Sequence, residues 1–489
     1  MLILPCALRP DGVVACHPTV ASHSNHLSLG ATGTNLKFPE NPARGWRGSA
    51  GWVGRLRRPA TSLYAQLYHP RAVAFSRTGE VFIGDALNHR IRKIDTNGII
   101  TTVAGNPTET KPSGSPAGAF GGDGGPATSA QLNQPHGVAV DSKGNVYIAD
   151  SLNNRIRKID TSGVISTVVG SDSKKGRPEG PVETAVLKFP KSMFMTPDDV
   201  LYICNSEGNT ILKVDLKAEQ LTVNRVAGNL YAKRYGGDGG FARDAALNTP
   251  QGVWVVPDGT VYFSDSENHL VRKVTTGGKI STIAGDAEAA RRAAETGQYP
   301  IPGESSGDGG PATKARLNGP RGISADEAGN VYVAEEGGGR IRRIDPSGII
   351  TTIAGNGQPP PEGHNPHVAG DPGPAPALEA QFNTIHDLNI DRDGNLWIAD
   401  SKNNRIRVVS DPANAPAGNV PQGPPPSSGS PDPQSPPNSD AASATTTTTA
   451  AAAPATTTTT AVAAGETAPS PTTTTTGAEA KPADPPKAP

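Results

Sequence analysis

The chain has 489 residues, with 45 Lys and Arg against 46 Asp and Glu, and a formal net charge of −1. This balance gives no reason to expect nucleic acid or an anionic membrane surface as the partner of the whole chain. The three cysteines, Cys6, Cys16 and Cys204, cannot form a disulfide framework, and no apolar run approaches the roughly 20 residues that span a bilayer.

Residues 1–58 lack the pattern that fills most of the chain. They carry seven Lys and Arg residues against Asp11 and Glu40, and they show little alternation of apolar and polar residues. This composition predicts a disordered basic arm. Met1–Leu8 is apolar, but no basic residue precedes it and no clear small-residue cleavage site follows, so it is a poor secretory signal.

A repeated unit begins at residue 59, and the stretch from Leu132 to Gly170 shows it most clearly. Four short runs of alternating apolar residues are separated by turns rich in Gly, Asn and Asp. The runs are Val138–Asp141, Val146–Asp150, Arg155–Asp160 and Ile165–Val169. This alternation predicts a four-stranded antiparallel meander. One such sheet cannot bury its own faces, so the unit has to pack against copies of itself.

The unit occurs six times along the chain. Its leading apolar residue is, in turn, Leu67, Leu132, Leu187, Leu247, Leu317 and Phe382. Six such sheets predict a six-bladed β-propeller over residues 59–409. The sixth copy stops before its fourth strand, so the completing strand should come from before Pro59, where Gly51–Leu56 is the best match. Without a donor, this blade would keep an exposed edge.

Three motifs carry a resemblance to a known repeat. They are Pro135-His-Gly-Val-Ala-Val-Asp141, Asn145-Val-Tyr-Ile-Ala-Asp150 and Asn154-Arg-Ile-Arg-Lys158. These motifs closely resemble the NHL repeat, of the bacterial or teneurin-like kind, and the resemblance extends from Leu67 to about Val409. It implies an all-β fold, a six-bladed NHL-type β-propeller with disordered termini. Cys204 falls on a strand of this fold and is expected to be a buried apolar filler.

Three connections between repeats contain Gly-Asp-Gly-Gly, at residues 122–125, 237–240 and 307–310. Each continues into a stretch of small residues. We expect a tight turn whose aspartate caps a short helical turn leading into the next blade. A Ca²⁺ site is the alternative, since Asp and loop carbonyls are hard oxygen ligands. A phosphate-binding glycine loop is disfavoured because no lysine follows.

The first strand of each meander should line the central axis, so the residues at its start should surround the mouth of the channel. In five repeats these residues follow a proline, and in the sixth Ile385 replaces it. The ring consists of Arg71, His136, Lys191, Gln251, Arg321 and His386. All six are polar and none is acidic. They either fill a wet channel by bonding to one another or form a pocket for a carboxylate, a phosphate or an acidic peptide segment.

Two enzyme families with related propellers supply alternatives. The peptidyl-hydroxyglycine amidating lyases, which the repeat resembles, place three histidines on a zinc ion near the axis. Here His136 and His386 are the metal candidates, and the blade between them offers Arg71 with His69 nearby. A third zinc ligand is therefore not evident.

The lactonase-type propellers hold an axial Ca²⁺ with acidic and amide side chains. The mouth of this chain offers only Asp387, next to His386. His364 and His367 lie in a proline-rich insertion, where a histidine pair is usually solvated. We expect no cofactor, with zinc or calcium as the alternatives.

An Asp and Arg signature surrounds the turn between the second and third strands. Asp85, Asp150, Asp265 and Asp400 precede this turn, while Asn205 and Glu335 take the position in the other two blades. Arg90, Arg155 and Arg405 follow it. Such pairs could suggest acid–base chemistry, but their near-repetition predicts a hydrogen-bond network of the turns.

In residues 410–489, Pro, Ala, Ser and Thr dominate and aromatic residues are missing. Such a segment cannot bury enough apolar surface to order itself, so it is expected to be a disordered tail. Its Thr and Pro content is compatible with an O-glycosylated stalk, which favours an extracellular or cell-surface location over a cytoplasmic one.

These patterns predict a monomeric, non-catalytic recognition scaffold that binds a protein, a carbohydrate or another anionic ligand at the channel mouth. The first alternative is a metal-dependent lyase or hydrolase centred on His136 and His386. The second is RNA binding by a basic top face, as in some NHL propellers. Arg71, Lys191 and Arg321 would then contact phosphates, with an affinity that falls steeply with salt.

Overall fold

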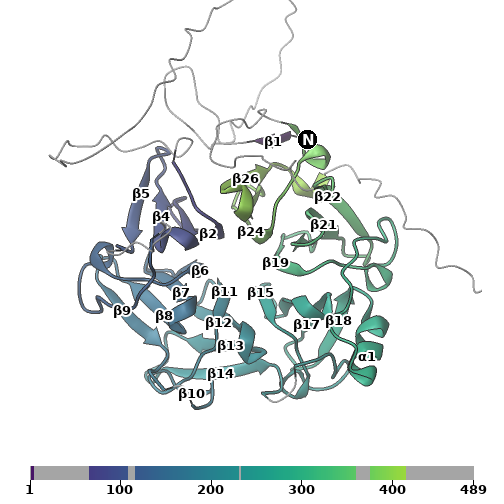
Figure 1. The fold of residues 1–489 in the computed structure, drawn as a ribbon, viewed down its shortest axis with the longest axis horizontal. Coiled ribbons are helices and arrows are strands. Elements are labelled where there is room, and N and C mark those ends of the chain that lie inside the picture. Colours follow the sequence, from purple (N-terminus) through teal and green to yellow (C-terminus); the bar gives the residue numbers. More distant parts are fainter. Residues whose placement is uncertain are drawn as a thin grey trace, which may run out of the picture. The chain divides into compact units, whose positions relative to one another are not determined.

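The computed structural model describes residues 2–4, 65–107, 116–173, 175–230, 233–358 and 375–414. Within these residues, six antiparallel sheets follow one another around a central axis (Figure 1). The predicted all-β, six-bladed propeller is therefore confirmed. The arm between Leu4 and Ala65, the pair His364 and His367, and the tail after Asn414 lie outside the described residues.

Blades 1 and 2 have four strands each. Blade 1 consists of β2 (Pro70–Phe75), β3 (Val81–Asp85), β4 (Arg90–Ile94) and β5 (Ile100–Ala104). Blade 2 consists of β6 (Pro135–Val140), β7 (Val146–Asp150), β8 (Arg155–Ile159) and β9 (Ile165–Val169). All four runs predicted in blade 2 are strands. β6 begins before its predicted start because Pro135 already pairs with Asp150 across the sheet.

Blades 3 to 5 repeat this plan. Blade 3 consists of β11 (Pro190–Met195), β12 (Val200–Asn205), β13 (Thr210–Asp215) and β14 (Thr222–Ala227), with the short β10 (Gly180–Pro181) on its outer edge. Blade 4 consists of β15 (Pro250–Val255), β16 (Val261–Asp265), β17 (Leu270–Val274) and β18 (Ile280–Ala284). Helix α1 (Ala287–Thr296) follows it. Blade 5 consists of β19 (Pro320–Ala325), β20 (Val331–Glu335), β21 (Arg340–Ile344) and β22 (Ile350–Ala354).

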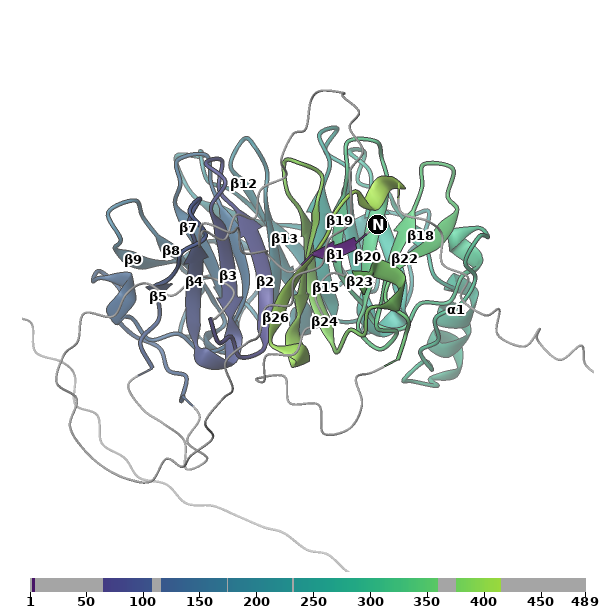
Figure 2. The same ribbon diagram turned by 90° about the horizontal axis from the view of Figure 1, so that it is seen from above.

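Blade 6 combines segments from both ends of the repeat region. It consists of β24 (Ile385–Ile390), β25 (Leu396–Asp400) and β26 (Arg405–Val409), completed by β1 (Leu2–Leu4) and β23 (Ala375–Pro376). The completing strand comes from before Pro59, as predicted, but it is Leu2–Leu4 and not Gly51–Leu56, which lies outside the described residues. Ile3 pairs with Val409 and Leu4 with Val408, so β1 covers the edge of β26 (Figure 2).

The hydrophobic core lies between neighbouring blades. In one cluster, Ile91 of blade 1 packs with Leu132 and Ile148 of blade 2, and each is at most 1% exposed. Leu132 is the leading apolar residue of its repeat, and its equivalents occupy the same kind of position in the other clusters. Cys204 is fully buried in one of them, as predicted. Packing between neighbours is thus what holds the ring together.

Side chains from the turn between the second and third strands also join each blade to the next. In blade 2, Ser151 Oγ donates to the carbonyl of Pro190 at 2.6 Å, and Asn154 Oδ1 accepts the N–H of Phe189 at 2.7 Å. Blade 6 is joined to blade 1 in the same way, by Ser401 and Asn404. The turn residue that accepts has a positive φ, which Asn tolerates better than most residues.

The predicted network of aspartates around these turns is confirmed. Asp150 is fully buried and accepts the N–H of Asn133 at 2.7 Å and the amide of Asn153 at 2.8 Å. The basic partner of Asp150 is Arg157, at 3.3 Å, and not Arg155 of the predicted signature, which pairs with Asp172. A network repeated in this way is part of the blade structure.

The aspartate of Gly-Asp-Gly-Gly has a different role from the predicted one. The short turn of Ala127–Ser129 forms, but it has no side-chain cap. Asp123 instead accepts from Arg157 Nη2 at 2.6 Å and from Thr167 Oγ1 at 2.6 Å. The equivalent pairs Asp238–Arg272 and Asp308–Arg342 are 2.5 and 2.6 Å long. A fully buried guanidinium needs carboxylates on both sides, which explains why capping is not the function of this aspartate.

Candidate functional site

The six innermost strands β2, β6, β11, β15, β19 and β24 surround the centre of the ring (Figure 1). Each begins at the same end of the channel, and its second residue is the one that the sequence places at the mouth. Neighbouring inner strands contact one another, which brings these second residues together. We call Arg71, His136, Lys191, Gln251, Arg321 and His386 the mouth ring.

Five members of the mouth ring line one small cavity with a volume of about 20 Å³, which is room for a single water-sized group. Arg71 Nη1 donates to the ring of His136, and Lys191 Nζ donates to Gln251 Oε1 at 3.0 Å. The rings of His136 and His386 meet edge to face, with centroids 6.4 Å apart. Arg321, the sixth member, is not among the residues that line this cavity, and it pairs with Glu336.

Two cationic side chains of the mouth ring have lowered pKa values. Burial, together with the nearby charge of Arg321, lowers the pKa of Arg71 to about 10. Burial, followed by the charges of Arg321 and Arg71, lowers the pKa of Lys191 to about 7. Among the described residues, neither Arg71 nor Lys191 has a carboxylate within ion-pair distance, so their neighbours disfavour the charge that they carry.

The two histidines of the mouth ring are held neutral. Burial lowers the pKa of His136 and of His386 well below the usual range, and the surrounding cations lower it further. A neutral His136 can accept the hydrogen bond from Arg71. Over the described ranges, no three His, Cys, Asp or Glu side chains come together as a metal-binding group, so His136 and His386 stand as a pair without a third such ligand.

Three glutamates near the mouth do not belong to the predicted mouth ring. Glu207 and Glu267 occupy the second position of the turn between strands two and three in blades 3 and 4. In blade 5, Glu336 occupies the first position of this turn, and Gly337 occupies the second. Leu87, Leu152 and Lys402 hold this position in the other blades. Alignment of the six turns groups Glu207 with Glu267, and Glu336 lies one position earlier in its own turn.

A buried carboxyl lies directly behind His386. Asp387 lines the cavity and accepts the N–H of Val73 at 3.3 Å. Burial raises the pKa of Asp387 to about 7, against the opposing effect of backbone hydrogen bonds. From the sequence, Asp387 is the one acid expected next to the ring. The structure places it in the cavity wall.

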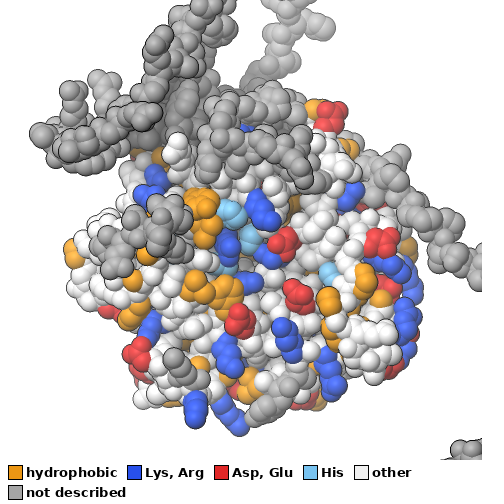
Figure 3. Space-filling view, in the orientation of Figure 1, with side chains coloured by type: hydrophobic (Ala, Val, Ile, Leu, Met, Phe, Trp, Pro, Cys, Tyr) orange, Lys and Arg blue, Asp and Glu red, His pale blue; other side chains and the backbone are white. Residues whose placement is uncertain are grey.

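The space-filling view shows Lys, Arg and His side chains gathered at the centre of this face, with acidic side chains beside them (Figure 3). The mouth is therefore a cationic floor with carboxylates on part of its rim.

No helix in the described part of the chain is long and apolar enough to cross a membrane.

Comparison with known proteins identifies the repeats. The teneurin NHL domain family matches residues 115–183 and 289–369, and the NHL repeat family matches residues 382–409. Human teneurin-4 is 30% identical over 288 residues, which are 55% of this chain and 10% of teneurin-4. The chloroplastic protein SUPPRESSOR OF QUENCHING 1 of Arabidopsis thaliana is 27% identical over 314 residues, 60% of this chain and 27% of that protein. The chain thus spans a small part of these relatives.

Solved structures show more distant likeness. Virginiamycin B lyase from Staphylococcus aureus has 16% identity and a TM-score of 0.39, covering 71% of this chain and 86% of the lyase. The gluconolactonase XC5397 from Xanthomonas campestris has 13% identity and a TM-score of 0.43, covering 71% of this chain and 87% of the gluconolactonase. Likeness at this level carries no functional inference. Segments of the chain thus match the teneurin NHL domain and the NHL repeat, and the described residues form a six-bladed β-propeller.

Proposed function

We propose that the protein is a non-catalytic recognition propeller whose mouth ring binds a carboxylate of a protein partner. The observation that carries this proposal is the pairing of Arg71 and Lys191 with neutral partners, His136 and Gln251, in a cation-rich cavity. A carboxylate placed between Arg71 and Lys191 would supply the missing counter-charge. Charge-assisted hydrogen bonds of this kind are stronger than neutral ones.

The size of the cavity favours a single inserted group over an extended polyanion. With a volume of about 20 Å³, the cavity has room for one small group such as a carboxylate, but not for a sugar ring or a nucleotide. RNA binding through Arg71, Lys191 and Arg321 would need exposed phosphate contacts along a track. These three side chains are instead partly buried around one point. An aspartate, a glutamate or a free C-terminal carboxylate fits best.

The rim adds selectivity to the proposed site. Arg321 is already neutralised by Glu336, and Glu207 and Glu267 extend the negative rim through blades 3 and 4. A partner would therefore present one acidic residue to the floor and basic or neutral residues to this side. Uniformly acidic surfaces would be repelled by the glutamates. The Thr- and Pro-rich tail supports an extracellular setting for such an encounter.

Binding of a short peptide tests the proposal. A labelled peptide with one central glutamate among neutral residues should bind the full-length protein, and the same peptide with glutamine should bind about tenfold more weakly. Arg71→Gln should weaken binding of the glutamate peptide by a similar factor. Lys402→Gln, which removes an exposed lysine from the rim, should leave it unchanged.

Three outcomes would overturn the proposal. One is equal binding of the glutamate and glutamine peptides, and another is equal weakening by Arg71→Gln and Lys402→Gln. The third is tight binding of a single-stranded RNA that depends on Arg71 and falls steeply with salt, which would establish the alternative of nucleic-acid recognition.

A further inference from the structure

The opposite end of the channel carries a second, larger hollow. Its volume is about 360 Å³, and its walls are the final residues of β2, β6, β11 and β24 with the turns that follow them. The mouth ring occupies the first residues of the same strands. The two sites therefore lie toward opposite ends of the inner strands, and Val138 and Met193 line both of them.

Blade 3 supplies three large apolar side chains to the wall of this hollow. Its inner strand ends in Met193-Phe194-Met195, where the equivalent strand of blade 2 ends in Val138-Ala139-Val140. The sequence has only three methionines, and two of them lie here. Phe194 packs on Trp254 of blade 4 with ring centroids 4.5 Å apart. Methionine side chains adapt to the shape of an apolar partner, which suits a wall that has to fit a ligand.

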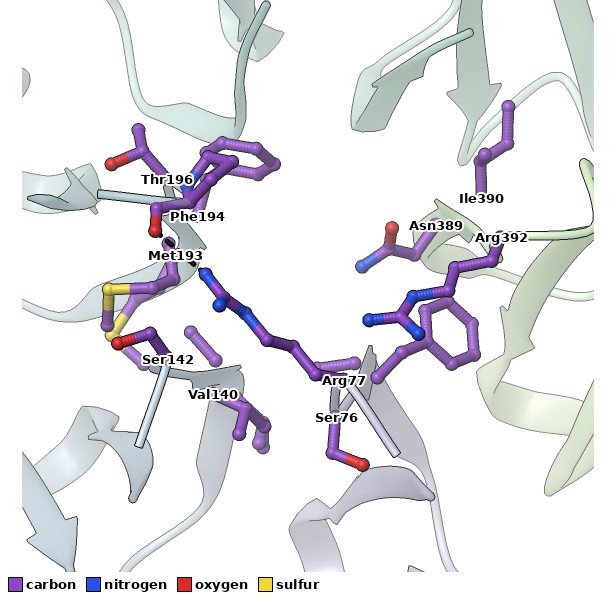
Figure 4. A pocket seen from close by; sticks show the side chains of 16 residues that line it. Ser76, Arg77, Val140, Ser142, Met193, Phe194, Thr196, Asn389, Ile390 and Arg392 are labelled. Carbon is purple, nitrogen blue, oxygen red and sulfur yellow. Dashed lines mark hydrogen bonds between the residues drawn. The ribbon is translucent and has the colours of Figure 1, made fainter. Parts of the chain in front are cut away.

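Two exposed arginines stand at the edges of the hollow. Arg77 follows β2 and donates from Nη2 to the carbonyl of Pro197 at 2.8 Å. Arg392 follows β24, and its guanidinium faces the open space together with the amide of Asn389 (Figure 4). Over the described residues, Arg392 has no ion-pair partner.

No Asp or Glu is among the residues that line the hollow. Asp199 interacts electrostatically with Arg77, but it is already bonded to Ser142 and paired with Lys217 at 3.7 Å. Asp393 is exposed next to Arg392 in the sequence but does not line the hollow. The positive charge of the two arginines is thus not balanced within the hollow.

We propose that this hollow binds a small organic acid with an apolar body, such as an aromatic or branched aliphatic carboxylate. Known small-molecule sites are concave and mostly apolar, have a few polar groups that orient the ligand, and begin at about 300 Å³. The apolar body contacts Met195, Phe194 and Ile390, and the carboxylate accepts from Arg77 or Arg392. This site differs from the mouth ring, which has the charge but neither the volume nor the apolar wall, although Val138 and Met193 line both cavities.

Methyl NMR of isotope-labelled methionine tests this site directly, because the protein has so few methionines. Naphthoate is the probe, and naphthalenemethanol, which has the same ring without the charge, is its matched control. Naphthoate should shift the methyl signals of Met193 and Met195, each assigned by its Met→Leu variant, in a saturable manner. Naphthalenemethanol should bind about tenfold more weakly, as should naphthoate to Arg392→Gln.

The mouth variant Arg71→Gln separates the two sites, and it should leave naphthoate binding unchanged. The inference is overturned if neither methionine signal responds to naphthoate, if naphthalenemethanol binds as tightly as naphthoate, or if Arg77→Gln and Arg392→Gln both leave the affinity unchanged. Both arginines are exposed, so these variants should keep the fold.

Discussion

Arginines in the blade walls and cations at the channel mouth are buried in opposite ways. Arg157, Arg272 and Arg342 are fully buried, and each lies between two carboxylates. Arg71 and Lys191 are partly buried beside neutral groups and other cations. The first arrangement satisfies its charges within the protein. The second leaves the positive charges without a carboxylate, which a binding partner can supply. Both arrangements use buried basic residues, so the residue type alone does not tell a structural residue from a binding residue.

The largest effect should come from removing one of the fully buried arginines that lie between two carboxylates. Arg157→Met leaves Asp150 buried without its cation, and we expect the free energy of unfolding to fall by about 3–5 kcal/mol. Chemical denaturation measures this change. Lys158→Met, at the next position but only partly buried, should cost less than about 0.5 kcal/mol. If the free energy of unfolding fell by less than about 1 kcal/mol in Arg157→Met, these buried ion pairs would not be required for stability.

A smaller effect should follow from removing the buried carboxyl at the mouth. The pKa of Asp387 is raised to about 7, so the folded state holds a proton that the unfolded state releases near pH 4. The contribution of this group to stability is therefore largest below about pH 4 and is lost as the pH rises to about 7. Asp387→Asn should raise the free energy of unfolding by about 1–3 kcal/mol at pH 8. It should change little at pH 4, while the exposed Asp393→Asn changes neither value.

Lys191→Met should make the protein more stable but weaken its binding of the glutamate peptide. With its pKa lowered to about 7, Lys191 destabilises the folded state most when both states hold it protonated, below about pH 7, and this penalty disappears as the pH rises to about 10. The variant should be about 1 kcal/mol more stable at pH 7 and bind the glutamate peptide about tenfold more weakly. Wild-type affinity should fall as the pH rises above 7. A pH-independent wild-type affinity between pH 6 and 9 would show that Lys191 does not contact the ligand.

The smallest effect concerns the rim. Glu336→Gln frees Arg321 from its carboxylate and removes one negative charge near the floor. We expect the glutamate peptide to bind a few-fold more tightly, by about 0.5–1 kcal/mol, because the pair is only partly buried. Peptide titrations at low and high salt measure it, since the gain should shrink with salt. Weaker binding would mean that Glu336 positions Arg321 for the ligand.

The repeat pattern predicts most of the fold. Alternating residues and the leading leucines fix the six blades, and the position after each proline fixes the mouth ring. Partners that are distant in the sequence are harder to find. Asp123 and Arg157 are 34 residues apart, so the sequence does not indicate their ion pair. The local pattern around Asp123 predicts a cap on the turn that follows it. The three residues of β1 carry too little pattern to be matched to β26.

The mouth and the opposite hollow differ in how far they could be predicted. Arg71 and Lys191 occupy one repeat position, so their convergence follows from the ring alone. The hollow depends on Met195, Phe194 and Arg392, which depart from the repeat in only some blades. Such departures look like drift until coordinates place them around one space. The glutamates of the rim fall between these cases, because aligning the turns groups Glu207 with Glu267 but leaves Glu336 at another position.

The side-chain hydrogen bonds between neighbouring blades also indicate which junction of the ring should open first. Junctions from blades 2, 3, 4 and 6 use both a serine and a side-chain acceptor on the turn, as at Ser266 and His269. Blade 5 has Glu336-Gly337-Gly338-Gly339 there, and no such side-chain bond to β24 occurs among the described residues. Opening under force or heat should therefore start between blades 5 and 6, and not where the two ends of the repeat array meet. Amide exchange would show this as early labelling of Thr384, whose equivalents in the other blades are protected by those acceptors.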